Sequence, residues 1–252
     1  MKAESLLTAL DLPIGCCVDQ RVPKKLLVEH GTPTAPDKRY INDGIEELYW
    51  LAALKPTTIG VPEYRDTARE YLEIAVLRLA LRPDAKLKRL VELVHRAIPY
   101  PVLLLTEQEG RTALSCGHIR WAQNEADKMV LDGEIIAVLF DKSSTNDHDT
   151  AFCESLALGR QPRSTLYTLY QGWIGTLVAL KAARLTGQYK SAINDRQTAI
   201  RHQALQECAR LNAEIARLRA AAQKEKQMSR QVELNLNINR LQSDLKANIE
   251  KL

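Results

Sequence analysis

The C-terminal tail constrains the fold more than any other part of this sequence, because from Arg196 to Leu252 it contains neither glycine nor proline. Asp195 is a suitable N-cap at its start. As one uninterrupted helix, the tail would be about 85 Å long at about 1.5 Å per residue. A globular core built from the rest of a 252-residue chain cannot cover such a rod. The tail therefore predicts a helical or coiled-coil segment that extends from a smaller folded domain.

Apolar residues recur along the tail in two series with helical spacing. The first series comprises Leu211, Ile215, Leu218 and Ala222 and continues with Val232 and Leu236; the second comprises Leu234, Ile238, Leu241, Leu245, Ile249 and Leu252. Between Val232 and Asn239 the two series overlap, so the chain there alternates like a half-buried strand. Two overlapping stripes on one helix account for this alternation.

The two stripes lie on nearly opposite faces of the expected helix. A tail that folds back on its own domain would cover only one of them, so we expect a protein partner for the other. The expected partner-binding residues are Leu211, Ile215, Leu218, Val232, Leu234, Leu236, Ile238, Leu241 and Leu245. Self-association through the tail, and a bend into a hairpin between Lys224 and Gln231, both remain open.

The net charge of +4 comes from the tail. From Arg196 onward there are 11 Lys and Arg against 6 Asp and Glu, which leaves 24 against 25 for residues 1–195. The basic and acidic residues of the tail alternate around the expected helix. This pattern favours a solvated helical surface over a stripe that binds phosphates.

The N-terminus and the cysteines indicate a cytoplasmic protein. Glu4 and Asp11 interrupt the first apolar residues, unlike a signal peptide, and the stretch from Gly172 to Leu180 is too short to span a membrane. The five cysteines are odd in number and lack CxxC spacing, which suits a reducing compartment. We expect no membrane association.

Residues 1–142 predict an α/β core domain. Residues 71–81 and 134–140 have strand patterns, and residues 83–98 have a helical pattern that opens with Pro83 and Asp84 as start signals. Residues 100–121 predict two strands joined at "EQEG". Residues 43–54 fit either a strand or a helix. The expected fold is α+β, a small mixed or antiparallel sheet with packed helices, followed by a long helical tail.

The remaining boundaries follow from composition. The polar run 141–150 predicts a loop, and residues 165–185 predict a helix that stops at Gly187. We therefore expect a core domain at 1–142, a polar loop and helical connector at 143–190, and the long helix or coiled coil at 191–252.

Four stretches resemble a bacterial family known only as domain of unknown function forty-three ninety-one. They are "DQRVPKK" (19–25), "IEELYWLAALKPTTIGV" (45–61), "AIPYPVLLL" (97–105) and "KEKQMSRQVELN" (224–235). The resemblance implies a gene context beside helicases and DNA methyltransferases, in restriction-like or phage-defence clusters. It implies that the chain is an accessory subunit, with helicase or methyltransferase subunits as possible partners.

A nuclease of the restriction-endonuclease kind is the main enzymatic alternative. It needs an acidic residue on one strand and Glu-x-Lys on the next, so that two carboxylates hold Mg²⁺ beside a lysine that activates water. Glu46 or Glu47, with Glu73, could supply the carboxylates. Glu73, however, is followed by "IAV", and the nearest cation on that strand is Arg78. We therefore expect no catalysis, with a degenerate nuclease-like fold as an alternative.

DNA binding is a second alternative, because Arg21, Lys24 and Lys25 occur close together and could contact phosphates. The charge balance of residues 1–195 argues against it. Histidines and cysteines occur in "CGH" (116–118) and "HDTAFC" (148–153), but without a second ligand pair at zinc-site spacing. We expect neither a metal nor a cofactor. The predicted function is a non-catalytic interaction subunit of a DNA-modification or phage-defence complex.

Overall fold

The computed structural model describes residues 1–31, 33–123, 128–141, 148–191 and 194–252. It divides into two compact units, Met1–Leu177 and Val178–Leu252. The division falls within one helix, α7 (Leu166–Thr186). Each unit is described by itself below.

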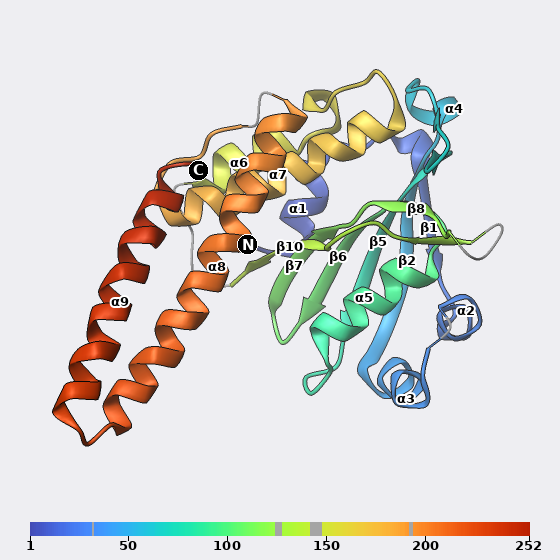
Figure 1. Cartoon of the computed structure of the whole chain (residues 1–252). Helices are drawn as coiled ribbons and strands as arrows, with labels where there is room; N and C mark the ends of the chain where they lie inside the picture. Colours follow the sequence, from blue (N-terminus) through green and yellow to red (C-terminus); the bar gives the residue numbers. More distant parts are fainter. Residues whose placement is uncertain (32, 124–127, 142–147, 192–193) are drawn as a thin grey trace. The chain divides into compact units, whose positions relative to one another are not determined.

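Unit 1 contains a mixed sheet of six strands, as the sequence predicts (Figure 1). In spatial order the strands are β1 (Cys17–Arg21), β2 (Ile45–Leu54), β5 (Ile74–Leu81), β6 (Val102–Gln108), β7 (Arg111–Cys116) and β10 (Ile136–Phe140). Strands β5 and β6 are parallel, and the other neighbouring pairs are antiparallel. Residues 43–54, which fit either pattern, thus form a strand from Ile45.

The parallel pair requires a crossover, because parallel strands cannot be joined by a tight turn. Helix α5 (Leu87–Ala97) provides it and packs on one face of the sheet. The shared core contains alternate residues of β5 together with apolar residues of α5: Ala75, Leu77, Leu79, Leu81, Leu90, Leu93 and Val94. Helices α2 (Lys24–His30) and α3 (Ala35–Gly44) contribute Leu27 and Ile41 to the same core.

The opposite face of the sheet carries α1 (Ala3–Ala9), α6 (His148–Leu156) and the first part of α7 (Figure 1). Leu6, Phe152 and Trp173 from these helices are fully buried. The Trp173 indole N–H donates to the Leu156 carbonyl at 2.9 Å, so the buried ring has a polar partner. The sheet therefore has a hydrophobic layer on both faces.

Shorter elements complete unit 1. They are η1 (Ile14–Cys16), α4 (Pro56–Ile59), β3 (Tyr64–Arg65), β4 (Glu70–Tyr71), β8 (Ile119–Trp121), β9 (Met129–Leu131) and η2 (Leu158–Arg160). Strands β3 and β4 form one two-stranded sheet and β8 and β9 another. The segment 100–121 thus holds three strands rather than two. The first two join at Glu109 and Gly110, where both residues have positive φ, as a tight hairpin turn requires.

Three predicted boundaries are wrong in detail. Helix α5 begins at Leu87 with Lys86 as its N-cap, so Asp84 is not the cap. Residues 148–150, expected in a polar loop, begin α6, while residues 142–147 lie outside the described chain. The Asn194 side chain, not that of Asp195, caps α8 by accepting from the Gln197 backbone N–H at 2.9 Å.

Unit 2 contains the end of α7 and two long helices, α8 (Asp195–Lys224) and α9 (Met228–Ile249). The tail is therefore two helices rather than one rod. At about 1.5 Å per residue they are about 45 and 33 Å long. The chain reverses between them at Glu225–Gln227, so the hairpin that the sequence left open is the observed arrangement.

Candidate functional site

The two apolar stripes of the tail pack against each other within the α8–α9 hairpin. Ile215 and Leu218 of α8 and Ile238 of α9 form a buried cluster. The partly buried Leu234, Leu241 and Leu245 pack against it. Spacings of three and four residues along both helices are those of an antiparallel coiled-coil seam. The argument that the second stripe needs an external partner is therefore wrong, because the first stripe covers it.

Helices α8 and α9 lie side by side as far as the C-terminal end of α9. The pKa of Glu207 on α8 is lowered, mainly by its hydrogen bond with Arg210 and also by the charge of Lys251. Lys251 follows α9, so the end of this helix lies beside the first half of α8. Leu211 and Cys208 of α8 are buried in this half of the hairpin.

The turn of the hairpin forms without glycine or proline because a side chain accepts hydrogen bonds from the backbone N–H groups of the turn. One carboxylate oxygen of Glu225 accepts hydrogen bonds from the backbone N–H groups of Lys226 at 2.8 Å and Gln227 at 2.9 Å. These bonds, with that of Gln227 as the largest cause, lower the pKa of the Glu225 carboxyl group. The Gln231 side chain also donates to the Ala222 carbonyl across the turn at 3.4 Å. The stretch "KEKQMSRQVELN" therefore encodes the helix reversal.

Three large apolar residues of α9 remain on the outside of the hairpin. Met228, Val232 and Leu236 are 76%, 55% and 64% exposed. Their spacing of four residues places them on one helix face, about 145° from the face that contains Ile238. We call Met228, Val232 and Leu236 the outer stripe. Val232 and Leu236 were expected to continue the α8 stripe, but they lie apart from it because the chain reverses between them.

The structure thus divides the nine expected partner-binding residues into two groups. Seven lie in the interior of the hairpin, fully or partly buried: Leu211, Ile215, Leu218, Leu234, Ile238, Leu241 and Leu245. Val232 and Leu236 are exposed. Met228, which the sequence reasoning did not name, extends their stripe toward the turn. The sequence signal for Met228 is its spacing of four residues from Val232, which places both on the same helix face.

The three cations expected to contact DNA are all engaged in unit 1. Arg21 lies 3.8 Å from Glu47, and Lys25 lies 3.2 Å from Glu29. The Lys24 ammonium donates to the Asn42 carbonyl at 3.1 Å, at the C-terminal end of α3. Burial and the nearby Arg82 and Arg21 lower the pKa of Lys24.

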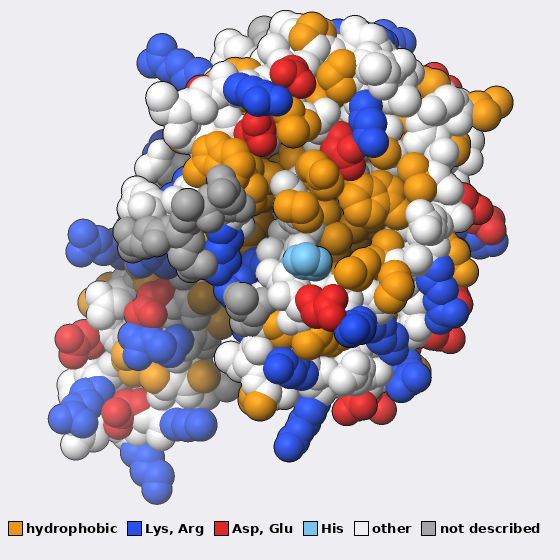
Figure 2. All heavy atoms as spheres, turned by 90° about the vertical axis from the view of Figure 1, so that its right-hand side faces the viewer, with side chains coloured by type: hydrophobic (Ala, Val, Ile, Leu, Met, Phe, Trp, Pro, Cys, Tyr) orange, Lys and Arg blue, Asp and Glu red, His pale blue; other side chains and the backbone are white. Residues whose placement is uncertain are grey.

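This surface carries both signs of charge. Figure 2 views the side of unit 1 that bears α2, α3 and α4, and shows hydrophobic side chains at the centre with both basic and acidic side chains around them. A protein that binds the phosphate backbone of DNA needs a predominantly positive surface. The contacts of Arg21, Lys24 and Lys25 and the mixed charge around them add no support for DNA binding there.

The carboxylates proposed for a nuclease site do not lie close together. Glu73 precedes β5 and pairs with Lys55 at 3.1 Å. Glu46 and Glu47 lie near the start of β2, whereas Ile74, which follows Glu73, pairs with Leu54 at the other end of β2. Glu46 and Glu73 therefore lie at opposite ends of the strand pair and cannot hold one metal ion together.

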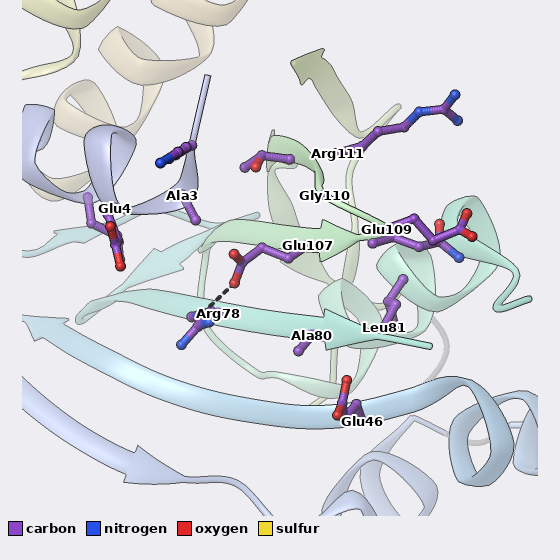
Figure 3. A pocket seen from close by; sticks show the side chains of 14 residues that line it. Ala3, Glu4, Glu46, Arg78, Ala80, Leu81, Glu107, Glu109, Gly110 and Arg111 are labelled. Atoms are coloured by element: carbon purple, nitrogen blue, oxygen red, sulfur yellow. Dashed lines mark hydrogen bonds and ion pairs between the residues drawn. The ribbon is translucent and has the colours of Figure 1, made fainter. Parts of the chain in front are cut away.

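A cavity of about 520 Å³ lies between α1 and the sheet. Arg78 of β5 and Glu107 of β6 form an ion pair in it, and Glu4 and Glu46 lie at its edges (Figure 3). Arginine remains protonated in proteins and cannot act as a general base. Arg78 therefore does not replace the lysine that a nuclease of this kind uses to activate water.

His118 of the "CGH" stretch lies in an aromatic cluster. Its Nδ1 lies 2.6 Å from the Tyr71 hydroxyl, and its Nε2 bonds the amide oxygen of Gln171. Because that oxygen can only accept, Nε2 carries the proton and Nδ1 accepts from Tyr71. The imidazole also stacks on Tyr167, whose other neighbour in the stack is Tyr64. Both ring nitrogens are used for structure, which leaves neither for a metal.

The sequence reasoning missed this cluster. Tyr167, Tyr170 and Gln171 lie three and four residues apart on α7, which would have indicated a shared helix face. Among the described residues, no group of three or more His, Cys, Asp and Glu side chains could hold a metal ion. None of the described helices has the length and apolar character needed to cross a membrane.

Comparison with known proteins identifies the family. The model for Domain of unknown function (DUF4391) matches residues 10–245, which is most of the chain. The chain belongs to this family. The matched region includes both units and nearly all of the α8–α9 hairpin, so the hairpin is part of the family's domain. No curated protein and no solved structure matches the chain.

Proposed function

We propose that this protein is a non-catalytic interaction subunit of a DNA-modification or phage-defence complex, and that it docks to a partner protein through the α8–α9 hairpin. The observation that carries the proposal is the outer stripe on α9. Its three large apolar side chains are more than half exposed although the interior stripes of the hairpin are paired. An apolar stripe on an otherwise polar helix is the usual anchor of a helix-in-groove or coiled-coil contact.

The residues around the outer stripe favour a partner of one kind. Arg240 lies one turn beyond Leu236, and within the described residues it forms no ion pair. A complementary surface would therefore present an apolar groove or helix face with a carboxylate near one end. The proposed contact is narrower than the nine residues expected from the sequence, and it consists of Met228, Val232, Leu236 and Arg240.

The sheet cavity supports a binding role over catalysis for unit 1. Its cations are Lys2, Arg78 and Arg111, of which Arg78 pairs with Glu107 and Arg111 with Asp141. Lys2 precedes α1 and does not follow a carboxylate on a strand, and Glu73 pairs with Lys55 instead of facing the cavity. The runner-up function is therefore a degenerate nuclease-like subunit that binds DNA without cleaving it. The feature that favours this alternative is the cavity beside α1, which is lined by the carboxyl groups of Glu4, Glu46 and Glu107 and by the guanidinium group of Arg78.

Co-purification with the helicase and DNA methyltransferase subunits implied by the family resemblance tests the proposal. We expect Leu236→Asp to abolish co-purification while Asn237→Asp, which adds the same charge about 100° away on the same helix, leaves it intact. Equal co-purification of wild type and Leu236→Asp would exclude the outer stripe as the docking surface.

A further inference from the structure

Four cations lie around the turn of the hairpin. Arg219 and Lys224 belong to the end of α8, Lys226 to the turn, and Arg230 to the start of α9. All four are exposed, and within the described residues none of them forms an ion pair with a carboxylate. We call Arg219, Lys224, Lys226 and Arg230 the tip cluster.

The single acidic residue between Arg219 and Arg230 is Glu225, whose carboxylate accepts from two backbone N–H groups of the turn. These hydrogen bonds hold it within the turn. The charge of Arg230 also contributes to lowering the pKa of Glu225, so this carboxylate interacts with one of the four cations. The tip therefore has four cations against one carboxylate. The charge surplus that the sequence attributed to the whole tail is concentrated at one end of the hairpin.

The body of the hairpin is different. Arg210 pairs with Glu207, and Arg217 pairs with Glu214, each within one turn of α8. Outside residues 219–230 the tail has seven Lys and Arg against five Asp and Glu. A cation that is already paired with a carboxylate cannot neutralise a phosphate and release the counterions of a polyanion. The four cations at the tip have no such ion pair, so they can.

We propose that the tip of the hairpin contacts the phosphodiester backbone of double-stranded DNA. This inference goes beyond the docking function, because it involves other residues and another partner. Exposed cations without a paired carboxylate are the groups that contact DNA phosphates. Gln223 and Gln227, both exposed beside the cluster, are suitable hydrogen-bond donors to phosphate oxygens. DNA is favoured over an anionic membrane because Met228 is the only large apolar residue in the segment 219–231.

Fluorescence anisotropy with a labelled 30-base-pair duplex tests the proposal on the full-length protein. In the tip variant Arg219, Lys224, Lys226 and Arg230 are all replaced by glutamine. In the matched control Arg196, Arg210, Lys246 and Lys251, which lie outside both the tip cluster and the proposed partner contact, are replaced by glutamine, which removes the same charge from the body of the tail. We expect the tip variant to lose at least about tenfold in affinity at low salt and the control to lose less than about threefold.

The salt dependence gives a second measurement. For the tip variant the slope of log K against log salt should fall by about 3 to 4, because each phosphate contact contributes about 0.9. Circular dichroism melts of both variants confirm folding, and Lys226→Glu in the exposed turn provides a single-site repeat of the test. Equal losses in both variants, or no DNA binding by wild type, would overturn the proposal. Tip-dependent binding to phosphatidylserine vesicles without binding to DNA would also overturn it.

Discussion

Ile238 of α9 and Ile215 of α8 lie in one buried apolar cluster, although 22 residues of chain separate them. Each of the two helices therefore covers the stripe of the other. Replacing Ile238 by aspartate would bury a carboxylate without a partner and remove apolar contacts. We expect Ile238→Asp to destabilise the hairpin by about 2–4 kcal/mol, measured as loss of helical signal at a lower temperature in a circular dichroism melt.

Leu236 lies only two residues away but faces outward. We expect Leu236→Asp to change the free energy of unfolding by no more than about 0.5 kcal/mol, as surface substitutions usually do. The same melt that detects Ile238→Asp serves as its measurement. A loss of stability comparable to that of Ile238→Asp would show that the outer stripe is covered within the protein, and the docking proposal would then be wrong.

Arg89 of α5 donates two hydrogen bonds of 2.8 Å to Asp37, which also caps the start of α3. The hydrogen bonds from Arg89 and Thr34 hold the pKa of Asp37 well below its ordinary value. A carboxyl group with a lowered folded pKa stabilises the fold above its unfolded pKa of about 3.9, and this stabilisation is lost as the pH falls further. We expect Asp37→Asn to cost about 1–2 kcal/mol at pH 7 in urea melts, with the difference from wild type shrinking below about pH 4.

His95 of α5 is buried beside Ser115, and burial lowers its pKa to about 3. Unfolding exposes it to water, where its pKa is about 6.5. The unfolded state therefore binds more protons below about pH 6.5, and the protein should lose up to about 1.4 kcal/mol of stability per pH unit there. Urea melts at pH 7, 6 and 5 measure this, and His95→Gln should show a smaller decline. An equal decline in the variant would assign the acid sensitivity to other groups.

We expect no nuclease activity, because no lysine follows Glu73 at Glu-x-Lys spacing, because Glu73 pairs with Lys55, and because Glu46 and Glu73 lie at opposite ends of the β2–β5 pair. Incubation of the purified protein with plasmid DNA and Mg²⁺ or Mn²⁺ measures this by gel electrophoresis. Cleavage that disappears in Glu46→Ala or Glu73→Ala would contradict the prediction and identify a catalytic site.

Truncation after Gln188 should leave a folded unit 1. Helix α7 ends at Thr186, and Gly187 follows with a positive φ, so the cut falls after a complete helix. We expect residues 1–188 to be soluble with one cooperative thermal transition, and to lose partner capture and DNA binding together. A molten or insoluble fragment would show that the hairpin is required for the fold of unit 1.

The sequence alone predicted a mixed or antiparallel sheet, the helix at 83–98 and the helical tail, because strands and helices bury faces with different periods. It did not predict that this helix connects two parallel strands. It could not resolve residues 43–54, whose apolar residues satisfy both periods. Pairing decides this segment: β2 lies between β1 and β5, where its backbone forms hydrogen bonds on both sides. The sequence also could not predict the His118 cluster, because its members come from β3, β4, the residue before β8, and α7.

The sequence by itself determined that the tail is helical and that it carries two apolar stripes. It did not determine what covers them, since an apolar stripe specifies a face to be buried and not the surface that buries it. Only the tertiary structure decided that the stripes cover each other, through a reversal stabilised by the Glu225 carboxylate instead of by glycine or proline. That reversal separates Val232 and Leu236 from the α8 stripe, and it brings four cations together at one end of the hairpin.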